Sequence, residues 1–122
     1  MALAALLDVH RDFAWFVVIG NAIAGAWALA ANWVPRLRMR VLWWFTAIVQ
    51  VSIFVQVILG VAVQNVDDIE APEFHLFYGF VAIIAVAIIY AYRLQLEQHR
   101  YLLYGCGGLF LMGLGIRSML LA

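Results

Sequence analysis

The sequence predicts an all-α integral membrane protein, a single domain of residues 1–122 folded as an antiparallel four-helix bundle. The hydrophobic fraction is 68% and the charged fraction is 11%, against about 45–50% and 25% in soluble domains. Four apolar segments each approach the roughly 20 residues that cross a bilayer. The connections between these segments are short, which makes consecutive helices antiparallel.

The four helices are expected at residues 13–34, 41–64, 74–92 and 101–121. The third follows Pro72, a residue that suits the first turn of a helix because its missing N–H has no partner to lose there. The sequence has a single cysteine and shows no nucleotide-binding or acid-pair motif, so it contains no complete catalytic set. A stand-alone enzyme is therefore disfavoured.

Charge predicts how the bundle lies in the membrane. Connections 35–40 and 93–100 carry five arginines between them. The connection between the second and third helices carries only acidic charges: Asp67, Asp68, Glu70 and Glu73. The positive-inside rule therefore predicts a multi-pass protein of the cytoplasmic (inner) membrane, with loops 35–40 and 93–100 cytoplasmic and both termini on the outer side.

Small residues recur at helical spacing on the first and fourth helices: Gly20, Ala24, Gly25, Ala28, Gly105, Gly108 and Gly115. In lipid, small residues allow helix backbones to approach closely. These faces are expected to pack on other membrane subunits or on a second copy of the chain, beside the lipid bilayer itself. The formal net charge is zero, so no nucleic-acid partner is indicated.

Several polar residues fall at membrane depth, where they are costly unless paired or functional. Asn21 lies near the midplane, at a depth similar to that of Gln50 and Ser52, which predicts a hydrogen bond between the first two helices. Gln56 and Gln64 lie at i+8 spacing on one stripe of the second helix. Structural hydrogen bonding and the lining of a ligand site both remain open for these amides.

Two histidines head parallel helices at the same predicted outer level. His10 precedes the first apolar segment and His75 opens the third, and each is followed four positions on by a small residue, Ala14 or Gly79. The positive end of a helix favours the neutral imidazole, which is the form that ligates metals. The pair is therefore a candidate metal site, although histidines at the ends of membrane helices are also ordinary interfacial residues.

A haem b held between His10 and His75 is the most specific form of this hypothesis. Copper or zinc is an alternative, but two histidines alone make an incomplete site for a bare ion. The supporting candidates are Arg11 and Arg117 for propionates, Gln56 and Gln64 as lining, and Gln64, Asp8, Asp12 and Glu73 as acceptors for the second ring nitrogen. Arg117 has an equal alternative, in which its side chain extends to the headgroups.

The arrangement of His10, Gln56 with Gly60, His75 and Arg117 resembles small four-helix membrane cytochromes b and the haem-carrying anchor subunits of respiratory enzymes. The resemblance implies a small subunit of an electron-transfer complex, respiratory or photosynthetic, with one haem near the outer face. Those families usually place their ligand histidines deeper and often have four. With two histidines near one surface, the resemblance supports one haem at most.

Two other functions remain open. One is a non-catalytic structural or assembly subunit of a larger membrane complex, which is supported by the small-residue faces. The other, ranked last, is a small oligomeric transporter or channel. Proton-coupled transport needs an acidic residue near the midplane, and all the carboxylates of this chain lie in connections or at helix ends.

Overall fold

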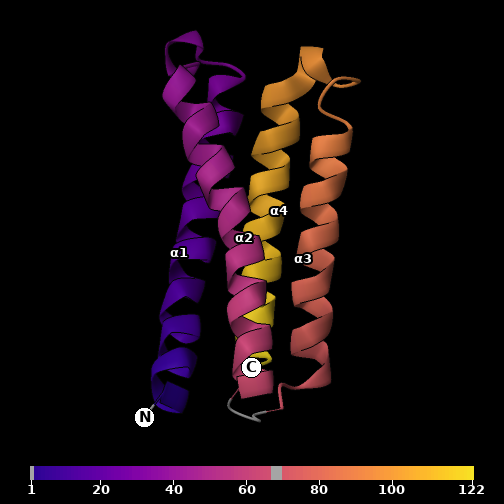
Figure 1. The fold of residues 1–122 in the computed structure, drawn as a ribbon. Helices are drawn as coiled ribbons and strands as arrows, with labels where there is room; N and C mark the ends of the chain where they lie inside the picture. The colour runs from indigo at the N-terminus through magenta and orange to yellow at the C-terminus, as the bar shows by residue number, and fades with distance from the viewer. Residues whose placement is uncertain (1, 67–69) are drawn as a thin grey trace.

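A computed structural model describes residues 2–66 and 70–122 and shows four long helices (Figure 1). Their bounds are α1 Ala2–Ala31, α2 Arg40–Val66, α3 Glu73–Ala91 and α4 Arg100–Leu120. Two short 3₁₀ turns, η1 Pro35–Leu37 and η2 Glu97–His99, lie in the connections. The all-α four-helix bundle is thereby confirmed. Asp67 and Asp68, which entered the charge argument, lie outside the described residues.

Helices α2, α3 and α4 begin and end within two residues of the predicted bounds, but α1 differs at both ends. It begins at Ala2 rather than at residue 13, because the exposed charged residues Asp8, Arg11 and Asp12 extend the helix beyond its apolar part. It ends at Ala31 rather than at residue 34. Val34 is extended (φ −117°, ψ 96°), as expected for a residue before proline.

All four long helices are long and apolar enough to cross a membrane. Many large apolar side chains lie exposed along them, among them Ile48, Ile58 and Ile88. Such surface is costly in water but not in hydrocarbon. The chain is therefore a candidate multi-pass membrane protein in contact with a lipid bilayer.

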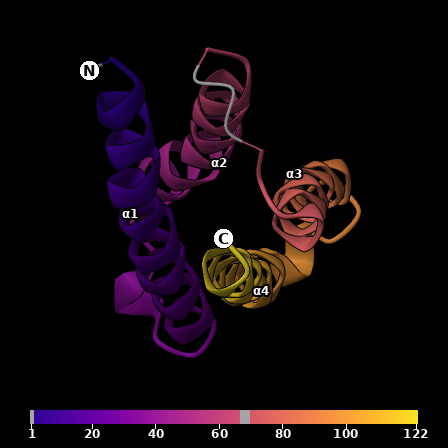
Figure 2. The ribbon, with the colours of Figure 1, turned by 90° about the horizontal axis from the view of Figure 1, so that it is seen from below.

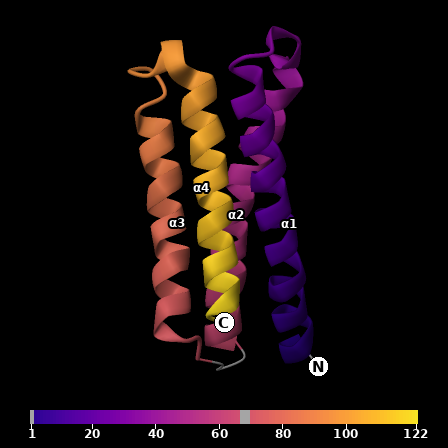
Figure 3. The ribbon, with the colours of Figure 1, turned by 180° about the vertical axis from the view of Figure 1, so that it is seen from behind.

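Helices α1 and α4 form the central pair of the bundle. Helix α2 also packs on α1, α3 packs on α4, and α2 and α3 touch much less (Figures 2 and 3). Both chain termini lie at one end of the bundle, here called the terminal end. The connections that hold η1 and η2 lie at the other, here called the arginine end (Figure 1). Helices α1 and α3 are diagonal neighbours.

Glycines bring α1 and α4 into backbone contact. A Cβ added at Gly25 would lie 2.6 Å from the backbone N of Leu109, and one at Gly105 would lie 2.7 Å from the backbone N of Leu29. At Gly108 the nearest atom would be the Cα of Gly25, at 2.7 Å. These small-residue faces, which were expected to serve partner subunits or self-association, are thus occupied within the chain.

Two polar residues at mid-depth, Asn21 and Ser52, bond within their own helices. The Asn21 amide donates to the carbonyl of Val17 at 2.8 Å, and the Ser52 hydroxyl donates to the carbonyl of Val49. The predicted hydrogen bond from Asn21 to the second helix was therefore wrong. The reason is that a backbone carbonyl one turn away offers the amide a nearer acceptor than a side chain on a neighbouring helix.

Side chains tie the α1–α2 connection to the helix ends. The Trp27 indole donates to the carbonyl of Leu37 at 2.9 Å. Arg38 donates through Nε to the carbonyl of Ala31 at 2.8 Å and through Nη2 to that of Asn32 at 2.9 Å. Because the last carbonyls of a helix have no partners within the helix, this arginine closes the C-terminal end of α1.

Candidate functional site

His10 and His75 meet in the interior of the terminal end. Their ring centroids are 6.0 Å apart and the ring planes are perpendicular, at 88°. In the described part of the chain, no Cα atoms of α1 and α3 approach within 8 Å. The two side chains therefore reach across the diagonal of the bundle and bring together helices whose backbones do not touch. We refer to them as the histidine pair.

The two histidines stand differently in their helices. His75 lies in the first turn of α3, after Pro72, as predicted, so the positive end of the helix acts on its ring. His10 lies in the third turn of α1, because that helix begins at Ala2. The expectation that a helix N-terminus keeps His10 neutral was therefore wrong, since the dipole effect fades within the first turn.

The last turn of α4 holds the His75 ring. Nδ1 of His75 lies 2.7 Å from the carbonyl oxygen of Ser118 and 3.0 Å from its hydroxyl. The Ser118 hydroxyl also lies within 3.3 Å of the His75 carbonyl, to which it donates. An Nδ1–H that donates to a carbonyl leaves Nε2 as the unprotonated nitrogen of a neutral ring. Nε2 is then the atom free to bind a ligand.

Ser118 was not among the acceptors predicted from the sequence, which were Gln64, Asp8, Asp12 and Glu73. Its position could have been found from helix register. His75 lies two residues after the start of α3, and Ser118 lies two residues before the end of antiparallel α4. The acceptor is a backbone carbonyl, and residue-type patterns do not reveal where a backbone group becomes available.

Helix α2 supplies the surroundings of His10. The Gln56 amide nitrogen donates to the His10 carbonyl at 2.7 Å, and a Cβ added at Gly60 would lie 3.1 Å from the ring atom Cε1. Glycine at position 60 thus lets the ring lie directly on the α2 backbone. Within the described chain, the buried atoms His10 Nδ1 and Gln56 Oε1 have no hydrogen-bond partner. Most buried polar atoms do have one.

The other predicted site residues lie around the histidine pair. Gln64 is half-buried on α2, one turn beyond Gly60. Arg11 and Arg117 are exposed, and the guanidinium carbon of Arg117 lies 6.0 Å from the centroid of the Tyr78 ring. A Cβ added at Gly79 would meet nothing within 4 Å. The structure thus joins His10, His75 and Gln56 directly.

The donor set fits a haem better than a bare ion. Among the described residues, no group of three or more histidine, cysteine, aspartate or glutamate side chains is placed to hold a metal. A structural zinc site needs about four protein ligands. A haem would need only two ligands from the protein, because its porphyrin supplies the others. His10 and His75 would be those two ligands, and His10 Nδ1 has no hydrogen-bond partner in the described chain.

Comparison with known proteins finds no matching family model, no similar curated protein and no similar solved structure.

Proposed function

We propose that this protein is a membrane-embedded electron-transfer subunit that holds one haem b between His10 and His75. The observation that carries the proposal is the histidine pair itself, with one ring anchored and the other lacking a partner for a buried nitrogen. A bound metal would give that nitrogen a partner, which most buried polar atoms have. A ligand between the rings accounts for the arrangement.

Each residue of the site has a separate task in this proposal. Ser118 fixes the orientation and tautomer of His75, as the partners of a metal-binding histidine commonly do. Gln56 and Gly60 seat His10 against α2. Arg11 and Arg117 neutralise propionates at the surface. When bound, the haem iron supplies one-electron redox chemistry, and the apolar helices around it exclude water.

The proposed topology follows from charge. We place the arginine end in the cytoplasm and the histidine pair near the outer face of the cytoplasmic membrane. Electrons would then be exchanged with a partner on the outer side or with a second carrier at membrane depth. One haem near one surface does not by itself make a path across the bilayer.

Spectroscopy of the full-length protein tests the proposal. Purified in detergent and titrated with hemin, the wild type is expected to show a Soret band and a sharp visible band on reduction, at one haem per chain. His10→Ala and His75→Ala are each expected to lose the six-coordinate spectrum. The matched control is His99→Ala, because His99 is exposed in η2 at the opposite end and should be dispensable.

Two results would overturn the proposal. One is the absence of stoichiometric hemin binding by folded wild-type protein, with folding checked by circular dichroism. The other is a six-coordinate spectrum that survives in both His10→Ala and His75→Ala. Either result would favour the alternative of a structural subunit without a cofactor. The support for that alternative is reduced, however, because the small-residue faces are used inside the bundle.

A further inference from the structure

Two adjacent cavities open at the arginine end, remote from the histidine pair. The larger, of about 390 Å³, is lined by Asn32, Arg38, Glu97, Gln98, Arg100 and Tyr101. The smaller, of about 210 Å³, is lined by Trp43, Arg93, Leu94, Glu97, Arg100 and Tyr104. Arg100 and Glu97 line both. Among the described residues that line them, Glu97 alone opposes the charge of three arginines.

Arg38 is held in place beside the larger cavity. Its two hydrogen bonds to the end of α1 use the Nε–H and one N–H of Nη2, which are two of the five N–H donors of a guanidinium. The remaining donors are free for another acceptor. An arginine that is already ordered loses little entropy when it binds an anion, which favours binding.

Two guanidinium groups converge on one aromatic ring. The guanidinium carbon of Arg38 lies 4.9 Å from the centroid of buried Tyr101, and that of Arg100 lies 5.2 Å from it. Both guanidinium groups line the larger cavity beside Tyr101, where their like charges repel each other. An anion between them would relieve the repulsion and accept hydrogen bonds from both groups.

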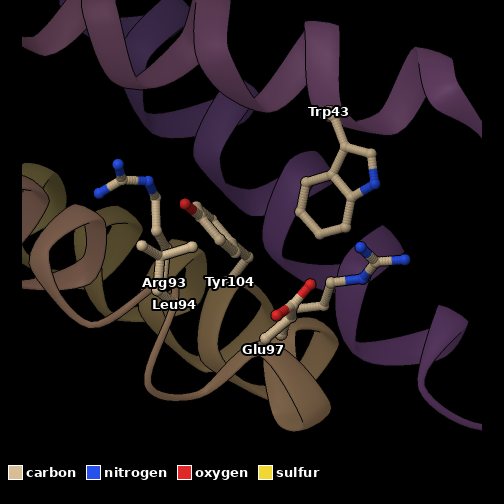
Figure 4. A pocket seen from close by; sticks show the side chains of 6 residues that line it. Trp43, Arg93, Leu94, Glu97 and Tyr104 are labelled. Carbon is tan, nitrogen blue, oxygen red and sulfur yellow. The ribbon is translucent and has the colours of Figure 1, made fainter.

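The smaller cavity has aromatic walls (Figure 4). Trp43 points from α2 toward Glu97 and Tyr104 on the opposite side. Arg93 is held on this side by a 2.8 Å hydrogen bond to the Tyr90 carbonyl and lies 3.7 Å from the centroid of the Tyr90 ring. Tryptophan and tyrosine are typical of the headgroup level of a bilayer. In a bilayer crossed by the four helices, the cavities would lie at the level of the lipid phosphates.

The start of α4 adds a further positive contribution. The helix begins at Arg100 without a side-chain cap, so its positive end faces the same region. The positive helix end adds to the attraction of an anion to the two cavities. It would not define a binding site without the arginines.

We infer that the arginine end binds a phosphate ester, held between Arg38 and Arg100 in the larger cavity, with Arg93 and Arg100 offering a second position. The ligand chemistry is a phosphodiester or phosphate anion, because planar guanidinium groups match its oxygens. A lipid source fits the depth of the cavities, since basic pockets between membrane helices bind anionic headgroups. The inference concerns the opposite end of the bundle and does not depend on haem binding.

Native mass spectrometry and thermal unfolding of the full-length protein in neutral detergent test the inference. The probes are phosphatidylglycerol, phosphatidylcholine and inorganic phosphate at matched ionic strength. Phosphatidylglycerol is expected to form adducts and to raise the unfolding temperature at about tenfold lower concentration than phosphatidylcholine. Comparable stabilisation by inorganic phosphate would support the site with a soluble phosphate as its source.

Arginine substitutions locate the site. Arg100→Gln is expected to weaken phosphatidylglycerol binding about tenfold or more, and Arg93→Gln to weaken it less. Arg36→Gln is the control, because Arg36 is exposed in η1 but lines neither cavity. The inference is overturned if all three probes bind equally weakly. It is also overturned if Arg100→Gln and Arg93→Gln, both folded by circular dichroism, bind phosphatidylglycerol as Arg36→Gln does.

Discussion

Ser118 and His75 join the last turn of α4 to the first turn of α3 through both their side chains and their backbones. The carbonyl of Ser118 lies 2.7 Å from the His75 ring, and the hydroxyl of Ser118 donates to the His75 carbonyl. One residue therefore orients the ring and also ties the two helix ends together. These two tasks use different atoms, so they can be separated by mutation.

Ser118→Ala is expected to lower the free energy of unfolding by about 0.6–1 kcal/mol, because it removes a hydrogen bond between helices. The His75 ring keeps its carbonyl acceptor, so any haem spectrum should be unchanged. Unfolding by sodium dodecyl sulfate in mixed micelles measures the stability. Ser52→Ala is the control, because the Ser52 hydroxyl bonds only within α2. Equal losses in both variants would contradict the assignment of Ser118 as an inter-helix contact.

Gly25→Ala is expected to destabilise the bundle by about 1–3 kcal/mol, because overpacking forces packed groups apart. The added Cβ would lie 2.6 Å from a backbone nitrogen of α4, and backbone atoms cannot rotate out of the way. The same micelle assay measures the change. Gly113→Ala should instead leave stability unchanged or raise it by up to about 1 kcal/mol, since nothing lies within 4 Å of its Cβ position and alanine favours helix. A stable Gly25→Ala variant would refute the close α1–α4 contact.

Reporter fusions are expected to place the two ends of the bundle on opposite sides of the membrane. Alkaline phosphatase fused after Ala122 should be active and green fluorescent protein should be dark there, because the terminal end is predicted to face outward. Fusions after Leu96, in the arginine-end connection, should show the reverse. The opposite pattern at both positions would invert the proposed topology and would move the histidine pair to the cytoplasmic face.

The helices themselves could be predicted because they depend on local sequence. Apolar length, the proline before α3 and the charged connections each act over a few residues. The start of α1 was predicted wrongly because a hydropathy pattern detects only the apolar part of a helix. Exposed residues such as Asp8 and Asp12 continue the helix without adding to that pattern. The extended Val34 before Pro35 likewise ended α1 early.

The candidate site could be predicted only in part. His10 and His75 were found because each lies at the start of the apolar part of its helix, and the two helices run parallel. The anchoring of His75 on Ser118 and the seating of His10 over Gly60 were not found. Both depend on how far each helix is rotated about its own axis. That rotation is set by the sum of many packing contacts rather than by any single residue.

By itself, the sequence determined an apolar four-helix chain with five of its seven arginines in the connections of one end and with His10 and His75 at the other. Composition and local periodicity are properties of each segment. Only the tertiary structure decided that the glycine faces of α1 and α4 pack against each other, that Asn21 bonds within its own helix, and that the two histidine rings meet across the diagonal of the bundle. These outcomes are relations between helices, and the physical cause is close packing, which depends on all four helices at once.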